Sequence, residues 1–203
     1  MTDIPIRCSC GSFKARVERA GPGYGNRVVC YCDFCQEFAR HLGRENEILD
    51  EHGGSDIYQV SSGRLKITEG KEHLACVYLT ARPILRWYTA CCNTPVGNTL
   101  GSNKLPFIGL LHNCIDTSAQ PGGLDELIGP IVARVNGGSA TGDTSHLDIH
   151  DSSPLKVYWR FAKTVLPPRI TGEHKKSPLF DQETGKPVVK PIRREPPYKS
   201  PEP

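Results

Sequence analysis

Seven of the nine cysteines fall into close groups whose spacing suits a metal site. Cys30, Cys32 and Cys35 form a Cys-x-Cys-x-x-Cys motif, which supplies three thiolates where tetrahedral zinc takes four ligands. Structural zinc sites are normally closed by four protein ligands, whereas catalytic sites keep one position open. The motif therefore predicts a zinc ion with an open fourth position, suited to catalysis or to binding a small molecule.

Two further cysteine pairs offer a second set of ligands. Cys8 and Cys10 lie near the N-terminus, and the adjacent Cys91 and Cys92 lie well downstream. These four thiols could close around another ion, as structural zinc requires. We therefore expect about two zinc ions per chain. The remaining thiols, Cys76 and Cys114, are expected in the core, because free cysteine is among the most buried residue types.

Length and composition favour one globular domain in a reducing compartment. The chain has 203 residues and 37% hydrophobic content. It begins without the basic and apolar regions of a signal peptide, and no run approaches the roughly 18 apolar residues of a membrane span. We expect a cytoplasmic protein without a membrane partner. In that reducing compartment, close-set cysteines indicate metal or redox chemistry rather than disulfides.

The charge distribution separates a neutral core from a basic C-terminal segment. Residues 167–203 hold eight Lys and Arg against five Asp and Glu, so the whole net charge of +3 lies there. The same segment carries nine of the 17 prolines. This composition predicts a zinc-binding domain over residues 1–166 and an extended or disordered tail over residues 167–203. Nucleic acid is not the expected partner, because it requires a concentrated basic face.

Hydrophobic patterning predicts a mainly β fold of short antiparallel strands. Alternating or β-branched runs separated by Gly-, Asp- and Ser-rich turns are typical of a meander. The predicted strands are Ser55–Val60, Arg64–Thr68, Leu74–Thr80, Ile84–Thr89, Phe107–Leu111, Ile131–Val135 and Leu155–Phe161.

One short helix is expected directly after the central cysteine motif. Asp33 can cap it, apolar side chains from Cys35 to Leu42 recur at helical spacing, and Gly43 suits its C-terminal end. The metal-binding loop then runs into a helix N-terminus. Unpaired amides and the helix dipole at that end favour negative charge, so thiolates at Cys32 and Cys35 form more readily.

The order of these motifs resembles the glutathione-dependent formaldehyde-activating enzyme family, which includes centromere-protein-V-like members. The family pattern is Cys-x-Cys-Gly, then Cys-His-Cys-x-x-Cys, then an aromatic residue before Cys-x-x-Cys-Gly-Thr/Ser-Pro. The matching segments here are Cys8–Gly11, Cys30–Cys35 and Trp87–Pro95. The resemblance covers roughly residues 6–165. It implies a zinc-stabilised β-tent fold, in which the outer pairs hold a structural zinc and the central triplet a second, catalytic one.

The sequence departs from this family pattern at two motifs. Aligning Thr94 and Pro95 places Thr89 on the first cysteine of the last pair and Asn93 on the glycine. Cys91 is the available replacement ligand, and adjacent cysteines share an ion only with some backbone distortion. A three-cysteine site completed by water or another side chain is the competing arrangement. Tyr31 stands where the family has histidine, so the resemblance does not carry a proton-transfer or orienting role of that histidine over to this position.

The function implied by the resemblance is that of a carbon–sulfur lyase. Such an enzyme would join or split a thiol and an aldehyde, as in S-hydroxymethylglutathione, with zinc binding the thiolate or polarising the aldehyde oxygen. The partner is then a small thiol or an aldehyde adduct. The alternative is a non-catalytic zinc-stabilised binding module whose basic tail engages an acidic partner, through pairs such as Lys175–Lys176 and Arg193–Arg194. The sequence predicts no oligomeric state.

Overall fold

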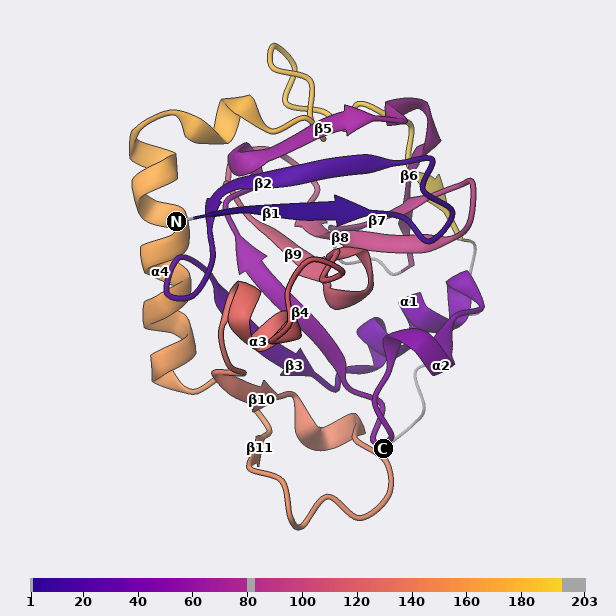
Figure 1. Ribbon diagram of the computed structural model, residues 1–203, viewed down its shortest axis with the longest axis vertical. Helices are drawn as coiled ribbons and strands as arrows, with labels where there is room; N and C mark the ends of the chain where they lie inside the picture. Colours follow the sequence, from indigo (N-terminus) through magenta and orange to yellow (C-terminus); the bar gives the residue numbers. More distant parts are fainter. Residues whose placement is uncertain (1, 80–82, 195–203) are drawn as a thin grey trace.

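The computed structural model describes residues 2–79 and 83–194, and it is mainly β (Figure 1). A three-stranded antiparallel sheet has the order β1 (Thr2–Arg7), β2 (Lys14–Ala20), β5 (Leu65–Glu69). A nine-stranded sheet has the order β11 (Ile149–His150), β10 (Ala133–Val135), β3 (Asn26–Cys30), β4 (Ser55–Val60), β9 (Ile108–Leu111), β8 (Thr94–Leu100), β7 (Ile84–Thr89), β6 (Leu74–Tyr78), β12 (Ile192–Arg193).

The helices surround these two sheets. They are α1 (Asp33–Leu42), α2 (Glu45–Ile48), α3 (Gly123–Ile128) and α4 (Leu155–Ile170). Single 3-10 turns occupy Ser62–Arg64, Lys71–His73, His112–Cys114, Gly137–Ser139 and Glu173–Lys176. In the part of the chain that the structure describes, no helix is both long and apolar enough to cross a membrane.

Among the described residues, the core has three buried clusters, which are divided between the two faces of the large sheet because successive side chains of a strand point to opposite faces. On β7, Leu85 and Trp87 are fully buried in the main cluster, where the three-stranded sheet contributes Ile4 and Ile6. Figure 1 shows β1 and β2 lying over β7 and β8, in agreement with this packing. On the other face of β7, Tyr88 packs with α1. The large sheet is thus covered on one face by the small sheet and on the other by α1 and by α4, whose Val157 packs with Val28 and Cys30 of β3.

The prediction of a mainly β chain is confirmed, and two of its details are wrong. Strands β4 and β7 have the predicted bounds. The large sheet is mixed rather than antiparallel, because β10 runs parallel to β3 and β11, and β12 runs parallel to β6. The described residues also form four helices rather than one.

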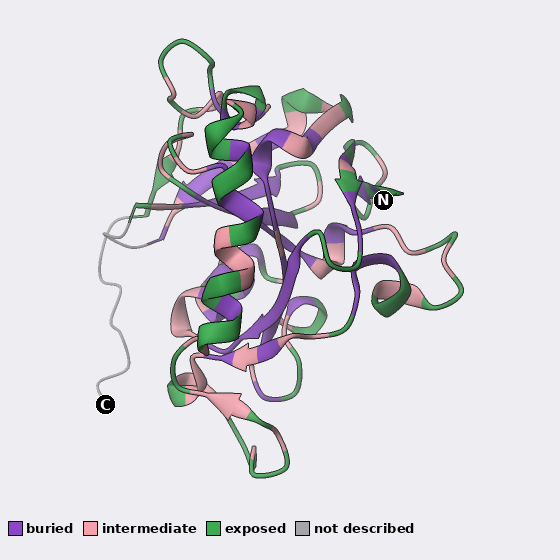
Figure 2. Cartoon of the chain, turned by 90° about the vertical axis from the view of Figure 1, so that its left-hand side faces the viewer, coloured by how far each residue is buried: buried purple, intermediate pink, exposed green. Residues whose placement is uncertain are grey.

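The segment Leu155–Phe161, predicted as a strand, is the first half of α4. A short apolar run does not by itself distinguish a strand from a buried helix. The deciding pattern extends past the run: the buried residues are Val157, Thr164, Val165 and Pro168, which share one face of a helix. Figure 2 shows α4 with its outer turns exposed and its inner face against the sheet.

The predicted tail is also corrected by the structure. The boundary at residue 166 falls inside α4, which includes Pro167 and Pro168 in its last turns. Beyond it, Leu179 and Phe180 are buried in the main core cluster, and the Phe180 ring meets Trp87 edge-on at 5.9 Å between centroids. Residues 167–194 are therefore part of the folded unit. The prolines at 196, 197, 201 and 203 lie outside the described residues.

We expect Phe180→Ala to lower the free energy of unfolding by about 3–5 kcal/mol, because it removes a large side chain from a packed core. Urea denaturation measures the change, and Glu183→Ala, at an exposed position of the same segment, is the control. Equal stability of the two variants would contradict the packing of Phe180 in the core and would support the extended tail predicted from composition.

Candidate metal centres

The central cysteine group forms where β3 ends and α1 begins. Cys30 is the last residue of β3, Cys32 is the N-cap of α1, and Cys35 lies in its first turn. The Cys35 amide donates to the Cys32 carbonyl oxygen at 2.9 Å, which fixes the turn. Asp33, predicted as the cap, is the first residue of the helix instead. The predicted stop at Gly43 is confirmed by its left-handed φ of 65°.

The sulfur positions have the size of a metal site. The three Sγ atoms of this triad all lie within 4.8 Å of one another, and those of Cys30 and Cys32 are 3.4 Å apart. Zinc–thiolate bonds of about 2.3 Å give tetrahedral sulfur–sulfur edges of about 3.8 Å. The group therefore needs little rearrangement to bind a metal ion through three thiolates.

Two polar side chains from other elements contact these sulfurs. Arg86 of β7 is only 5% exposed; its Nη1 donates to Cys35 Sγ at 3.7 Å, and its guanidinium lies 5.7 Å from the Phe38 ring centroid. Asn136, directly after β10, donates from Nδ2 to Cys30 Sγ at 3.1 Å. Its φ of 59° is in the left-handed region, which asparagine tolerates better than most residues. Both contacts stabilise negative charge on sulfur.

The triad has an asymmetric charge distribution without metal. Hydrogen bonds from Cys30 and Cys32, aided by the charge of Arg86, hold the pKa of Cys35 well below its usual value despite burial. Cys30 donates hydrogen bonds to Cys32 and to Cys35, and these bonds, together with burial, raise the pKa of Cys30. The hydrogen bond from Cys30 lowers the pKa of Cys32, but the bond to Cys35 and burial outweigh it and raise that pKa to about 11. Metal binding must therefore displace protons from Cys30 and Cys32, so affinity rises with pH.

The outer group joins the end of β1 to the turn between β7 and β8. All four Sγ atoms of Cys8, Cys10, Cys91 and Cys92 lie within 4.8 Å of one another. The Sγ distance is 3.5 Å from Cys8 to Cys10, 3.4 Å from Cys10 to Cys91, and 3.8 Å from Cys91 to Cys92. Cys91 thus completes a four-sulfur set with the dimensions of a closed tetrahedral site.

The backbone distortion expected from adjacent cysteines is present in that turn. Asn93 follows the pair with a φ of 54°, and its amide donates to the Thr89 carbonyl oxygen at 2.8 Å. Glycine is the residue that adopts such a φ most readily. Asparagine is the next most tolerant type, so the turn keeps its shape and brings both Cys91 and Cys92 to the group.

Hydrogen bonds preorganise the outer sulfurs. The Phe13 amide donates to Cys8 Sγ at 3.3 Å. Although partial burial opposes it, hydrogen bonding from Ser9, Thr94 and Thr89 lowers the pKa of Cys92 to about 4. Arg44, between α1 and α2, donates to the Cys92 carbonyl oxygen at 2.7 Å. The loop around this group is therefore tied to the helical layer.

The two groups differ in burial as well as in ligand number. Cys10 and Cys91 of the outer group are exposed. In the triad, Cys30 and Cys35 are buried and Cys32 is partly exposed. The outer set is a closed four-sulfur arrangement at the surface. The triad is a three-sulfur arrangement in which Cys32 is the one partly exposed ligand.

Tyr31 is held away from proton-transfer chemistry. It is fully buried, and its hydroxyl donates to Asp50 Oδ2 at 3.0 Å. Burial and the nearby Asp50 carboxylate raise the pKa of Tyr31 to about 12. The phenol therefore stays neutral at physiological pH and connects the metal-binding loop to the segment after α2.

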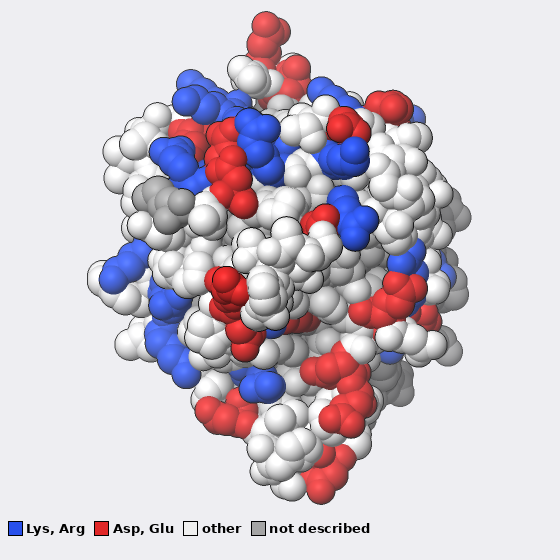
Figure 3. Space-filling view, viewed as in Figure 1, with Lys and Arg blue, Asp and Glu red and all other residues white. Residues whose placement is uncertain are grey.

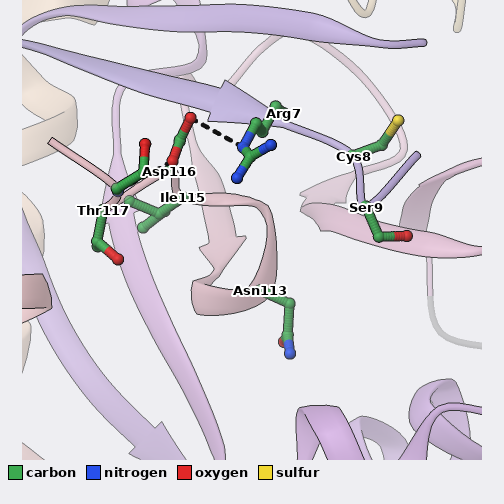
Figure 4. A pocket seen from close by; sticks show the side chains of 8 residues that line it. Arg7, Cys8, Ser9, Asn113, Ile115, Asp116 and Thr117 are labelled. Carbon is green, nitrogen blue, oxygen red and sulfur yellow. Dashed lines mark hydrogen bonds and ion pairs between the residues drawn. The ribbon is translucent and has the colours of Figure 1, made fainter. Parts of the chain in front are cut away.

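A surface cavity of about 280 Å³ lies beside the outer group, between the end of β1 and the segment after β9 (Figure 4). The Arg7–Asp116 ion pair, 2.8 Å long, stands at its wall. Asn113 lies below that pair, and its amide points away from it and donates to the Glu47 carbonyl oxygen. Cys8 lines it too, but its sulfur points away from the other labelled polar groups. This cavity therefore does not present the outer thiols to a ligand.

Sequence reasoning found the cysteines of both groups but missed Arg86 and Asn136. A single charged residue inside the apolar run Ile84–Thr89 was the available signal, because arginine is seldom buried without a partner. Asn136, followed by two glycines, indicated only a loop. Cys76 and Cys114 are core thiols as predicted.

A family model described as a family of unknown function, DUF6151, matches residues 1–192. The chain belongs to the DUF6151 family. The match in this DUF6151 protein includes both cysteine groups and extends beyond α4, as the folded C-terminal segment does. Among curated proteins, none matches the sequence. A crystal structure of a Rhodobacter sphaeroides protein, a structural genomics target, is similar at 19% identity with a TM-score of 0.41, over 61% of this chain and 97% of that one.

Proposed function

We propose that this DUF6151 protein is a zinc-dependent enzyme of the carbon–sulfur lyase type, with a structural zinc at the outer group and a reactive zinc at the triad. The observation that carries the proposal is the difference between a closed four-sulfur set and a buried three-sulfur set in one domain. The proposal includes a β-tent fold related to glutathione-dependent formaldehyde-activating enzymes, supported by the order of the cysteine motifs.

The donor set supports zinc as the metal. Both groups offer thiolates, which suit zinc, copper(I) and iron–sulfur clusters, whereas calcium and magnesium require oxygen ligands. Every cysteine among the described residues is free, as expected for a cytoplasmic protein in which thiols stay reduced. Tetrahedral S–S edges of about 3.8 Å are close to the distances within both groups.

Charge at the triad supports a thiolate as the fourth ligand. Three thiolates and a divalent ion leave one net negative charge, which would disfavour a further anion. Arg86 supplies the opposite charge from a buried position, and Asn136 donates to a second sulfur. These two donors withdraw charge from the cysteine sulfurs and offset the cost of another thiolate. The open position is thereby suited to a small thiol such as glutathione.

The proposed reaction is the reversible cleavage of an S-hydroxymethyl thioether. The carbon–sulfur bond breaks, its electron pair stays with sulfur as a thiolate, and the hydroxyl releases its proton to solvent as the carbonyl of formaldehyde forms. A bound zinc lowers the pKa of a thiol and polarises an aldehyde oxygen. The residues of the chain hold the site: Arg86 and Asn136 balance its charge, and α1 places Cys32 and Cys35 at a helix N-terminus.

Cobalt substitution tests the open position. We expect the thiolate-to-metal absorption of the cobalt protein to intensify when glutathione is added, because an exogenous thiolate becomes the fourth ligand. The increase should vanish in Cys32→Ser and persist in Cys76→Ala, a buried thiol outside both groups. A spectrum that ignores thiols in the wild-type protein would contradict the proposal.

The lyase step is tested separately from thiol binding. Cleavage of S-hydroxymethylglutathione is expected to proceed faster with the zinc protein than with Cys32→Ser at equal concentration. If thiols bind and the two rates are equal, the triad is a thiol-binding zinc site without lyase activity, and the non-catalytic binding module becomes the function.

A further inference from the structure

A second cavity, whose lining includes no cysteine, lies between α4 and the turn that joins β2 to β3. Its volume is about 220 Å³. Arg64, Arg160 and Lys163 line it, together with the backbone of the Gly23–Gly25 turn, and its lining contains no acidic residue. Three cationic side chains from two distant segments therefore meet at one small hollow.

Arg160 has donor capacity that the folded chain does not use. Its Nη2 donates to the Gly25 carbonyl oxygen at 3.2 Å, which anchors the guanidinium to the β2–β3 turn. Its Nε is shielded from solvent and has no hydrogen-bond partner within the described part of the chain. A hydrogen-bond donor that has lost water without gaining a partner is costly, so an anion that accepted from this Nε would recover part of that cost.

The other two cations are held in place by their own contacts. The Lys163 ammonium lies 5.4 Å from the Trp159 ring centroid. Arg64 donates from Nε to Glu173 Oε1 at 3.2 Å and from Nη1 to the Arg19 carbonyl oxygen at 3.0 Å. Glu173 thus balances one of the three positive charges. The positive charges of Arg160 and Lys163 have no acidic partner in the lining, so the cavity is suited to a ligand with two negative charges.

The surrounding surface adds to this charge. Helix α4 carries four cationic residues, Lys156, Arg160, Lys163 and Arg169, and no acidic residue. Lys and Arg atoms lie along the edge of the molecule that α4 occupies in Figure 1 (Figure 3). A positive field over the helix would draw anions toward the cavity at its inner side.

We propose that this cavity binds the phosphoryl group of a small phosphate-containing ligand. Arginine suits phosphate because its planar donors engage two oxygens together, and lysine adds a point charge. The volume is below the roughly 300–1,000 Å³ of pockets for drug-sized molecules, so the site fits a phosphoryl group with little attached to it. This inference is independent of the metal chemistry.

Calorimetric titration with inorganic phosphate and with glycerol 3-phosphate tests the proposal and separates the two sources of the group. Saturable binding of at least one is expected, with affinity at least tenfold lower in Arg160→Gln and in Lys163→Gln. Lys156→Gln is the matched control, since Lys156 is an exposed cation of the same helix that does not line the cavity. The fluorescence emission of Trp159 should change over the same range of phosphate concentration, because its ring contacts Lys163.

Three results would overturn the proposal: no saturable binding of either compound, equal loss in Lys156→Gln, or unchanged affinity in Lys163→Gln. Arg160→Gln could lower the melting temperature by removing the hydrogen bond to Gly25. In that case Lys163→Gln alone decides, because Lys163 is an exposed residue whose replacement leaves that bond intact.

Discussion

Replacing Cys10 with serine is expected to unfold the protein, although Cys10 lies at the surface. Exposed substitutions usually change stability by less than about 0.5 kcal/mol. A structural zinc, however, contributes on the order of 10 kcal/mol of apparent binding free energy, which is comparable to the whole stability of a domain. Loss of one of four ligands at the outer group should therefore abolish the cooperative thermal transition seen by circular dichroism.

The neighbouring residue provides the control for this variant. Ser12 is exposed beside Cys10, and its hydroxyl lies 3.4 Å from the Cys10 sulfur. Ser12→Ala should retain the wild-type melting temperature within a few degrees. If Cys10→Ser melted like Ser12→Ala, the outer group would not hold a structural metal.

Replacing Arg86 with methionine is expected to lower the affinity of the triad for zinc by about 10–100-fold. This is the usual effect of losing a side chain that hydrogen-bonds to a metal ligand. The guanidinium lies against Cys35 and the Phe38 ring in a buried position, where its charge favours the thiolate. Competition with a chromophoric chelator measures the affinity. The change should be accompanied by a weaker cobalt response to glutathione.

Arg40→Met is the matched control for Arg86→Met. Arg40 lies on the outer side of α1, where it contacts Glu37 and Gln36 and touches no cysteine. Its replacement should leave zinc affinity unchanged. Equal affinity of the two variants would show that the buried charge does not serve the metal site.

The close cysteine spacing was enough to single out the triad and the two outer pairs, because metal ligands repeat in short motifs that need no tertiary information. That the outer pairs meet depends on the fold, which brings the end of β1 to the turn between β7 and β8. Whether Cys91 could join Cys92 was open in the sequence, since the answer depends on the left-handed turn at Asn93. Arg86 and Asn136 reach the triad from β7 and β10. Such contacts depend on which strands become neighbours in the sheet, and local patterns do not specify that order.

The C-terminal quarter, from Leu155 onward, shows the opposite limit of sequence reasoning. Proline density and charge favoured an extended tail, yet Leu179 and Phe180 provide enough apolar surface to dock residues after α4 on the core. Composition averages over a segment, whereas docking requires only a few well-placed side chains. The strand prediction at Leu155–Phe161 failed for a related reason, because the helical burial pattern becomes visible only when residues up to Pro168 are included.

Native mass spectrometry of freshly prepared, unchelated protein tests the central claim most directly. Two zinc ions per chain are expected in the wild type. Cys32→Ser should retain one, because the outer group remains intact while the triad loses a ligand. A wild-type protein with less than one zinc per chain, or a Cys32→Ser variant with the same zinc content as the wild type, would contradict a two-zinc protein with a reactive triad.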